Sequence, residues 1–193
     1  MQQFKNALNC VQYNAPVILS FTLLSLIVYF LNELTGWANF NLFSVYRSPL
    51  TNPLGYIRLF GHVLGHVDIN HYFNNFLMIL LAGPMLEEKY GSKNILLMIV
   101  FTAVVTGLIH VLLFPNTVLL GASGVVFMMI LLSSFVNLKK GKIPLTLIVC
   151  VIVFIGREIA GGLLQQDHIS QITHILGGGC GAFFGFYLNR NRM

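Results

Sequence analysis

A serine flanked by glycines stands at the start of one of the apolar runs in this sequence. The stretch GASGVV places Ser123 between Gly121 and Gly124. The first amide groups of a helix have no acceptor within that helix, and the helix dipole adds positive potential there. A nucleophilic serine at this position therefore has groups close by that can stabilise an oxyanion. The alternative is structural, with Ser123 as a helix cap and the glycines as packing sites.

A serine nucleophile needs a base, and His174 in the stretch HILGGGCGAFFG is the candidate. Gly177, Gly181 and Gly185 follow it at helical spacing and share its face, so that another helix can approach closely. That face can bring His174 to Ser123. The alternative is that the glycines serve helix packing only and that His174 forms a hydrogen bond with a backbone carbonyl group. His168 is a rival base, but it lacks the glycine face.

Polar side chains are concentrated in the stretch GHVLGHVDINHYFNN. His71 and Asn75 are four residues apart, so on a helix both can donate hydrogen bonds to one developing oxyanion. His62 and His66 have the same spacing, which is compatible with a metal pair or with histidines bonded inside a folded loop. The zinc-protease pattern HExxH is absent. We therefore expect no metal and no other cofactor.

The composition indicates which elements must hold these groups. The chain has 193 residues, of which 56% are hydrophobic and 9% charged, and its mean hydropathy of +0.78 is typical of a membrane protein. Its basic residues are dispersed, so no nucleic-acid partner is expected. We predict one all-α polytopic domain over residues 1–193 with a long interfacial loop at 33–69. Runs of suitable length predict six transmembrane helices at approximately 15–32, 70–86, 95–114, 122–138, 143–163 and 169–188.

The positions of the lysines and arginines predict the orientation, because cytoplasmic loops retain positive charge. Eight of the eleven basic residues fall on one side if the N-terminus is inside. Both termini are then cytoplasmic, and the beginning of the fourth span, with Ser123, faces outward.

Taken in order, these residues resemble the rhomboid family of intramembrane serine proteases, and in particular its bacterial GlpG type. The resemblance runs from about Tyr56 to Tyr187. It rests on five motifs, which are Arg58 in YIRLFGH, the HxxxN of His71 and Asn75, Glu87 in GPMLEEKYG, the GxSG around Ser123 and the HxxGxxxG from His174 to Gly181.

This resemblance implies a catalytic dyad without an acidic member, with Ser123 as nucleophile and His174 as base and then acid. It implies an oxyanion hole of His71, Asn75 and backbone amides near Ser123. It also implies that Arg58 and Glu87 fix the first loop against the second span and that His66 supports a hydrogen-bond network. Phe127 departs from the pattern, since some relatives have a tyrosine there that stacks on the histidine. The chain looks like a form consisting of the transmembrane core alone.

Cleavage of a transmembrane helix requires water and local unwinding, because its scissile carbonyl is hydrogen-bonded and shielded. The expected substrates are transmembrane proteins cut near the outer boundary of the bacterial inner membrane, with lipids as the surroundings and a cavity open to the periplasm. We expect the loop from Arg157 to Ser170 to cap the cavity, with Gly161 and Gly162 allowing it to move. The alternatives are a non-catalytic protein of the same fold that binds transmembrane partners, and a transporter.

Overall fold

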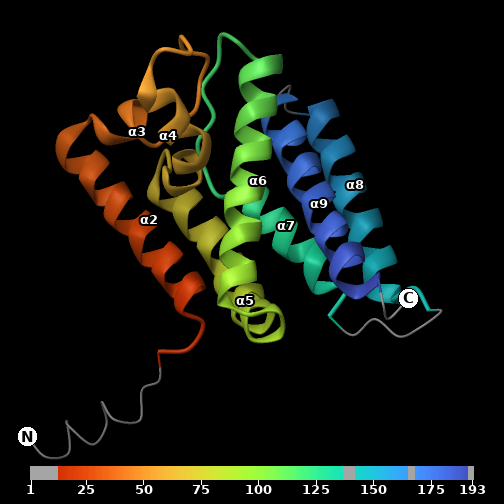
Figure 1. Ribbon diagram of the computed structural model, residues 1–193. Helices are drawn as coiled ribbons and strands as arrows, with labels where there is room; N and C mark the ends of the chain where they lie inside the picture. Colours follow the sequence, from red (N-terminus) through yellow and green to blue (C-terminus); the bar gives the residue numbers. More distant parts are fainter. Residues whose placement is uncertain (1–12, 137–141, 165–167, 191–193) are drawn as a thin grey trace, which may run out of the picture.

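The computed structural model describes residues 13–136, 142–164 and 168–190. Within these ranges the chain is helical, with a single isolated antiparallel bridge between Val45 and Leu119. Figure 1 shows long helices standing side by side, with short helices between α2 and α5 gathered at one end. The described elements are α2 (Pro16–Thr35), α3 (Ala38–Asn41), α4 (Pro53–Gly61), the 3-10 turn η1 (His62–Leu64), α5 (Ile69–Tyr90), α6 (Ser92–Leu113), α7 (Ser123–Ser133), α8 (Leu145–Leu164) and α9 (His168–Asn189).

The long helices coincide with the apolar runs of the sequence. Each of the six predicted spans overlaps one helix, α2 or α5 to α9. Among the described residues, α2 and α6 are long and apolar enough to cross a membrane by length and composition. The all-α prediction is confirmed, while the number of spans stays a prediction.

The start of α2 depends on a carboxylate from another helix. Ala15, before the first turn, has a φ of 48° and supplies no side-chain cap. The two oxygens of Glu87 in α5 accept hydrogen bonds from the amides of Val17 and Ile18, both at 3.0 Å. A buried negative charge at a helix N-terminus is favoured by the helix dipole. Glu87 therefore joins α5 to the start of α2.

The segment between α2 and α5 is folded. It contains α3, α4 and η1, and several of its aromatic rings are exposed, among them Trp37, Phe40 and Tyr56. Asp68 ends the segment as the cap of α5, because its side chain accepts a hydrogen bond from the amide of His71 at 2.8 Å. The predicted loop at 33–69 is thus a compact subassembly beside the long helices.

Helix α7 is shorter than the predicted fourth span. It ends at Ser133, whereas the apolar run continues to Leu138. Eleven residues rise about 16 Å, which is roughly half of a 30 Å hydrocarbon core. Figure 1 shows the chain descending beside α6 before α7 begins at mid-height. The length of the apolar run predicted that Ser123 would lie at the outer end of the bundle. In the structure, Ser123 lies further inside, where the short helix α7 begins.

The structure also differs from the predicted gate. Residues 157–164, expected to begin a loop, belong to α8, so that Gly161 and Gly162 lie in a helix. Residues 165–167 lie outside the described ranges, and 168–170 form the first turn of α9. The helix continues through the glycine pair, because each glycine costs a helix only about 1 kcal/mol.

Candidate active site

A cavity of about 520 Å³ collects the polar groups that the sequence singled out. Three helices contribute its lining residues, which are His71, Asn74, Asn75, Leu77 and Met78 from α5, Ser123, Val126, Phe127 and Ile130 from α7, and His174 from α9. Its volume lies within the range of small-molecule and substrate sites. Five polar side chains thus converge in one space that is otherwise apolar.

Gly121 determines how the chain enters α7. Its φ of +125° lies in a region that L side chains rarely adopt, and an added Cβ would lie 2.8 Å from Cε1 of His71. A side chain there would strain the backbone and displace His71. Because α7 begins at Ser123, the amides of Ser123 and Gly124 have no acceptor in their own helix. These amides belong to the same turn as the Ser123 hydroxyl.

The segment before Ser123 is tied to the folded loop by main-chain hydrogen bonds. Val45 and Leu119 exchange two, at 2.8 and 2.9 Å, and the Gly121 amide donates to the carbonyl of His62 at 2.9 Å. His110 of α6 adds a contact of 3.2 Å from its Nε2 to the carbonyl of Thr117. The amide of Gly121 is thus already bonded, and the unbonded amides nearest to the Ser123 hydroxyl are those of the first turn of α7.

Helix α9 lies directly against α7. An added Cβ on Gly177 would collide with the backbone of Gly124, and one on Gly181 would collide with the backbone of Met128. Helices approach this closely only where small residues face each other. The glycine face predicted from HxxGxxxG is therefore the α7–α9 contact, and it brings His174 to the cavity that Ser123 lines.

Phe127 and His174 face each other across this contact. Their ring centroids are 4.4 Å apart, with an interplanar angle of 38°. Phe127 lies about one turn beyond Ser123 on α7, so its ring contacts the imidazole from the helix that carries Ser123. The contact that a tyrosine makes in some relatives is made here by a phenyl ring, in a tilted arrangement.

A chain of hydrogen bonds orients Asn75. Ser25 of α2 donates to the carbonyl of Leu64 at 2.7 Å, which leaves its oxygen able to accept from Nδ1 of His66 at 3.2 Å. His66 Nδ1 is also 3.3 Å from the Leu64 carbonyl, so it carries the proton. Nε2 of His66 then accepts from Nδ2 of Asn75 at 3.1 Å. The second N–H of Asn75 remains for the cavity.

Burial keeps the loop histidines neutral. Desolvation lowers the pKa of His66 from 6.5 to about 4, and the neighbouring His71 adds to this effect. Desolvation likewise lowers the pKa of His62 to about 4, despite a hydrogen bond with the Arg58 carbonyl that acts in the opposite direction. Only the neutral form of His66 can accept from Asn75. The low pKa of His66 thus preserves the orientation of Asn75.

The two charged residues expected to fix the loop against the second span have separate contacts. Arg58 is buried, donates from Nε to the carbonyl of Asn41 at 2.9 Å, and places its Cζ 4.4 Å from the ring centroid of Tyr46. Arg58 therefore connects α4 to another part of the same interfacial loop and does not contact the second span through these groups. Glu87 binds the first turn of α2. The sequence motifs do not predict these partners, because Arg58 donates to a main-chain carbonyl and Glu87 accepts from main-chain amides, which every residue type offers.

The sequence indicates Asn74 as a polar group within an apolar span but assigns it no role, and the structure places it in the cavity lining beside Asn75. Sequence reasoning missed other groups near the site. Ser25 as the partner of His66 had no local signal, because 41 residues separate them. In the described part of the chain, no group of three or more His, Cys, Asp or Glu side chains could hold a metal ion. The surroundings of Gly161 and Gly162 and the side chain of His168 lie outside the described part of the structure.

Comparison with known proteins identifies the family of the chain. Residues 53–191 match the rhomboid domain. The chain is also similar to rhomboid-related protein 1 of Caenorhabditis elegans, with 27% identity over 143 residues. That match covers 69% of this chain and 40% of the worm protein, so the chain spans less than half of that relative's length. Together with the apolar helices α2 and α6, the domain match makes this a membrane protein. The chain belongs to the rhomboid family.

Proposed function

We propose that this protein is an intramembrane serine endopeptidase that cleaves transmembrane segments with a dyad of Ser123 and His174. The observation that carries the proposal is the single cavity lined by Ser123, His174, His71 and Asn75. Nucleophile, base and both side-chain oxyanion donors come from three different helices. Packing alone gives no reason for these four groups to share one space.

The reaction follows the general scheme of acyl transfer. His174 removes the proton from Ser123 Oγ as the oxygen attacks the scissile carbonyl. The resulting oxyanion accepts hydrogen bonds from His71, Asn75 and the first amides of α7. His174 then protonates the leaving amine, the peptide bond breaks, and an acyl-enzyme remains. Water, deprotonated by His174, hydrolyses the ester and restores both groups.

We propose the bacterial inner membrane as the location, a GlpG-type fold with six spans, and cytoplasmic termini. The exposed lysines Lys93 and Lys142 stand at the end of the bundle that this orientation puts in the cytoplasm. The beginning of α7 at mid-height then gives a cavity open toward the periplasm and sunk below the membrane surface. Transmembrane proteins are the substrates, and lipids surround the protein.

The decisive experiment uses purified protein in detergent and a model transmembrane substrate. Wild-type protein should cleave it near the outer boundary. Ser123→Ala and His174→Ala should each lower the rate by at least 10³-fold, in line with the loss of a nucleophile or its base. Cleavage that survives Ser123→Ala would reject the dyad. A wild-type protein that binds but never cleaves several substrates would support a non-catalytic partner-binding function.

We further propose that the end of α8 moves to admit the substrate, with Gly161 and Gly162 as its flexible point. Proline substitutions would break the helix in which these glycines lie. Alanine is the sharper test, because it stiffens a helix by about 1 kcal/mol per glycine replaced. The double alanine variant should lower kcat several-fold, whereas Gly156→Ala, with open space around it in the same helix, should not. Equal kcat values for the double alanine variant and the wild-type protein would contradict a gate at Gly161 and Gly162.

A further inference from the structure

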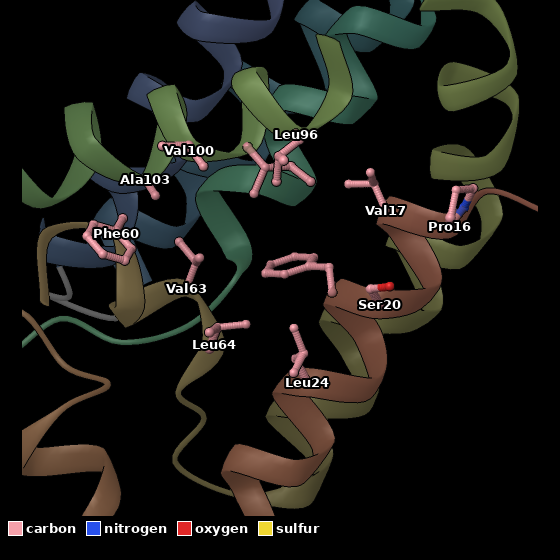
Figure 2. Close-up of a pocket in the computed structure, with 12 residues that line it drawn as sticks. Pro16, Val17, Ser20, Leu24, Phe60, Val63, Leu64, Leu96, Val100 and Ala103 are labelled. Carbon is pink, nitrogen blue, oxygen red and sulfur yellow. The ribbon is translucent and has the colours of Figure 1, made fainter. Parts of the chain in front are cut away.

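A second cavity lies away from the candidate active site, between α2, the α4–η1 turn and α6. Its volume is about 440 Å³. Figure 2 shows Leu24 of α2, Val63 and Leu64 of η1, and Leu96 of α6 converging on it. None of its lining residues contributes to the cavity of Ser123 and His174. The pocket is therefore not explained by the proposed reaction.

The chemistry of the lining excludes a polar ligand. Its floor consists of buried apolar side chains, including Phe21, Val63 and Ala103. Ser20 is the one polar side chain that lines it, and its hydroxyl already bonds to Tyr13 at 2.9 Å. The ligand must be apolar where it enters.

The location of the walls restricts the source of that ligand. Helices α2 and α6, which form two of them, are the described helices apolar enough to cross a membrane. Leu24, Leu96 and Val100 on the rim are also largely exposed, so the pocket opens toward the hydrocarbon region. In a bilayer that these two helices cross, lipid tails would contact this opening.

A lysine on α6, Lys93, lies on the same helix face as two residues that line the pocket, although it does not line the pocket itself. Lys93 is exposed and lies in the first turn of α6, three residues before Leu96 and seven before Val100. This spacing puts all three on one helix face. Pro16 and Val17 line the pocket from the first turn of α2. An ammonium group at headgroup level above an apolar slot complements a phosphate attached to an acyl chain.

The geometry points to a binding site for one anionic phospholipid, with an acyl chain between α2 and α6 and its phosphate at Lys93. The chain would lie along Leu96 and Val100 and reach Val63 of η1. The lipid comes from the leaflet on the Lys93 side. It fills the gap between α2 and α6 and supports η1, whose His62 carbonyl binds the amide of Gly121.

The test uses full-length protein in vesicles of phosphatidylethanolamine and phosphatidylglycerol, the latter carrying a photoreactive group in its acyl chain. Labelling of peptides that contain Leu96 to Ala103 should saturate as the fraction of the probe rises, because a site fills while random contact with bulk lipid does not. Val100→Trp places a large ring at the rim and should reduce the saturable labelling at least five-fold. Leu97→Trp, exposed on the same helix but not in the lining, should leave it unchanged.

The phosphate contact has its own pair of variants. Lys93→Gln should weaken competition by unlabelled phosphatidylglycerol at least three-fold and leave competition by phosphatidylethanolamine unchanged. Lys142→Gln, another exposed lysine away from the pocket, should alter neither. Labelling that rises linearly with the fraction of the probe would contradict a lipid site. Equal labelling of the Val100→Trp and Leu97→Trp variants would contradict it as well. In a parallel sample treated with a bifunctional protein cross-linker in place of the lipid probe, cross-links between two protein chains at these peptides would assign the surface to a second copy instead.

Discussion

At the level of single residues, the orientation of His174 is the critical detail of the proposed dyad. A general base must be held in a productive position relative to the nucleophile, and packing contacts contribute to this. Phe127 supplies one such contact, with 4.4 Å between the two ring centroids. A phenyl ring makes this contact without a hydroxyl group.

Replacing this ring should therefore affect turnover more than binding. We expect Phe127→Leu to lower kcat about ten-fold with little change in KM, since a mispositioned base weakens only the transition state. Phe127→Tyr should retain activity within about two-fold. Steady-state kinetics with a transmembrane substrate measures both, and unfolding temperatures check that each variant is folded. Equal kcat values for leucine and phenylalanine would show that packing elsewhere orients His174.

At the level of helices, the contact between α7 and α9 assembles the site. Gly177 and Gly181 meet the backbone of α7, whereas Gly179 on the other side of α9 has nothing within 4 Å of an added Cβ. These glycines provide a matched pair for testing close approach against intrinsic helix propensity.

Gly177→Ala and Gly181→Ala should each lower stability by about 1 to 3 kcal/mol, because overpacking forces the two backbones apart. Activity should fall further than stability, since His174 moves with α9. Gly179→Ala should leave activity unchanged and stability equal or slightly higher. Unfolding in mixed micelles, with cleavage assays on the same samples, gives both quantities. Tolerance of alanine at 177 and 181 would contradict the contact.

The helices also show what could be read from the sequence. The apolar runs predicted the bounds of α2, α5, α6, α8 and α9 to within a few residues, because the thickness of the bilayer sets the length of a span. The short α7 could not be predicted, since the apolar run continues past its end. Tethers such as Val45 with Leu119 were also beyond reach, because main-chain hydrogen bonds have no residue signature.

For the candidate site itself, the sequence identified Ser123, His174, His71 and Asn75, which the structure brings to one cavity. Helical spacing placed His71 with Asn75 and His174 with its glycines, since residues three or four apart share a face. The resemblance to the rhomboid family was needed to connect these groups with Ser123. The sequence did not reveal that Glu87 caps α2, because a carboxylate in an apolar span fits many partners.

At the level of the whole molecule, burial of neutral histidines couples stability to pH. The unfolded chain binds protons at His62 and His66 near pH 6.5, whereas the folded protein binds them only near pH 4. Between these values the unfolded state holds more protons, so stability falls as the pH falls from 6.5 toward 4. The loss is on the order of 3 kcal/mol for each histidine at the lower limit.

Unfolding measured in mixed micelles from pH 7 to 4.5 should therefore show a steady decline below pH 6.5. The His66→Gln variant has no titrating group at this position, so the slope of its unfolding free energy against pH should fall by the equivalent of about one proton. Its stability at pH 7 should also be lower, because the hydrogen bonds of His66 are lost. A pH-independent unfolding free energy in the wild type would show that these histidines are solvated.

The order of elements along the chain has a consequence for biosynthesis. Ser123 begins α7, but the helix that brings His174 to it is α9, the last described element. A ribosome inserts these helices one after another, so a nascent chain carries the serine through the translocon without a base beside it. The two groups meet only once α9 has packed against α7. If the dyad is the catalyst, the unfinished protein cannot cut its neighbours in the membrane, and no separate inhibitory segment is required during synthesis.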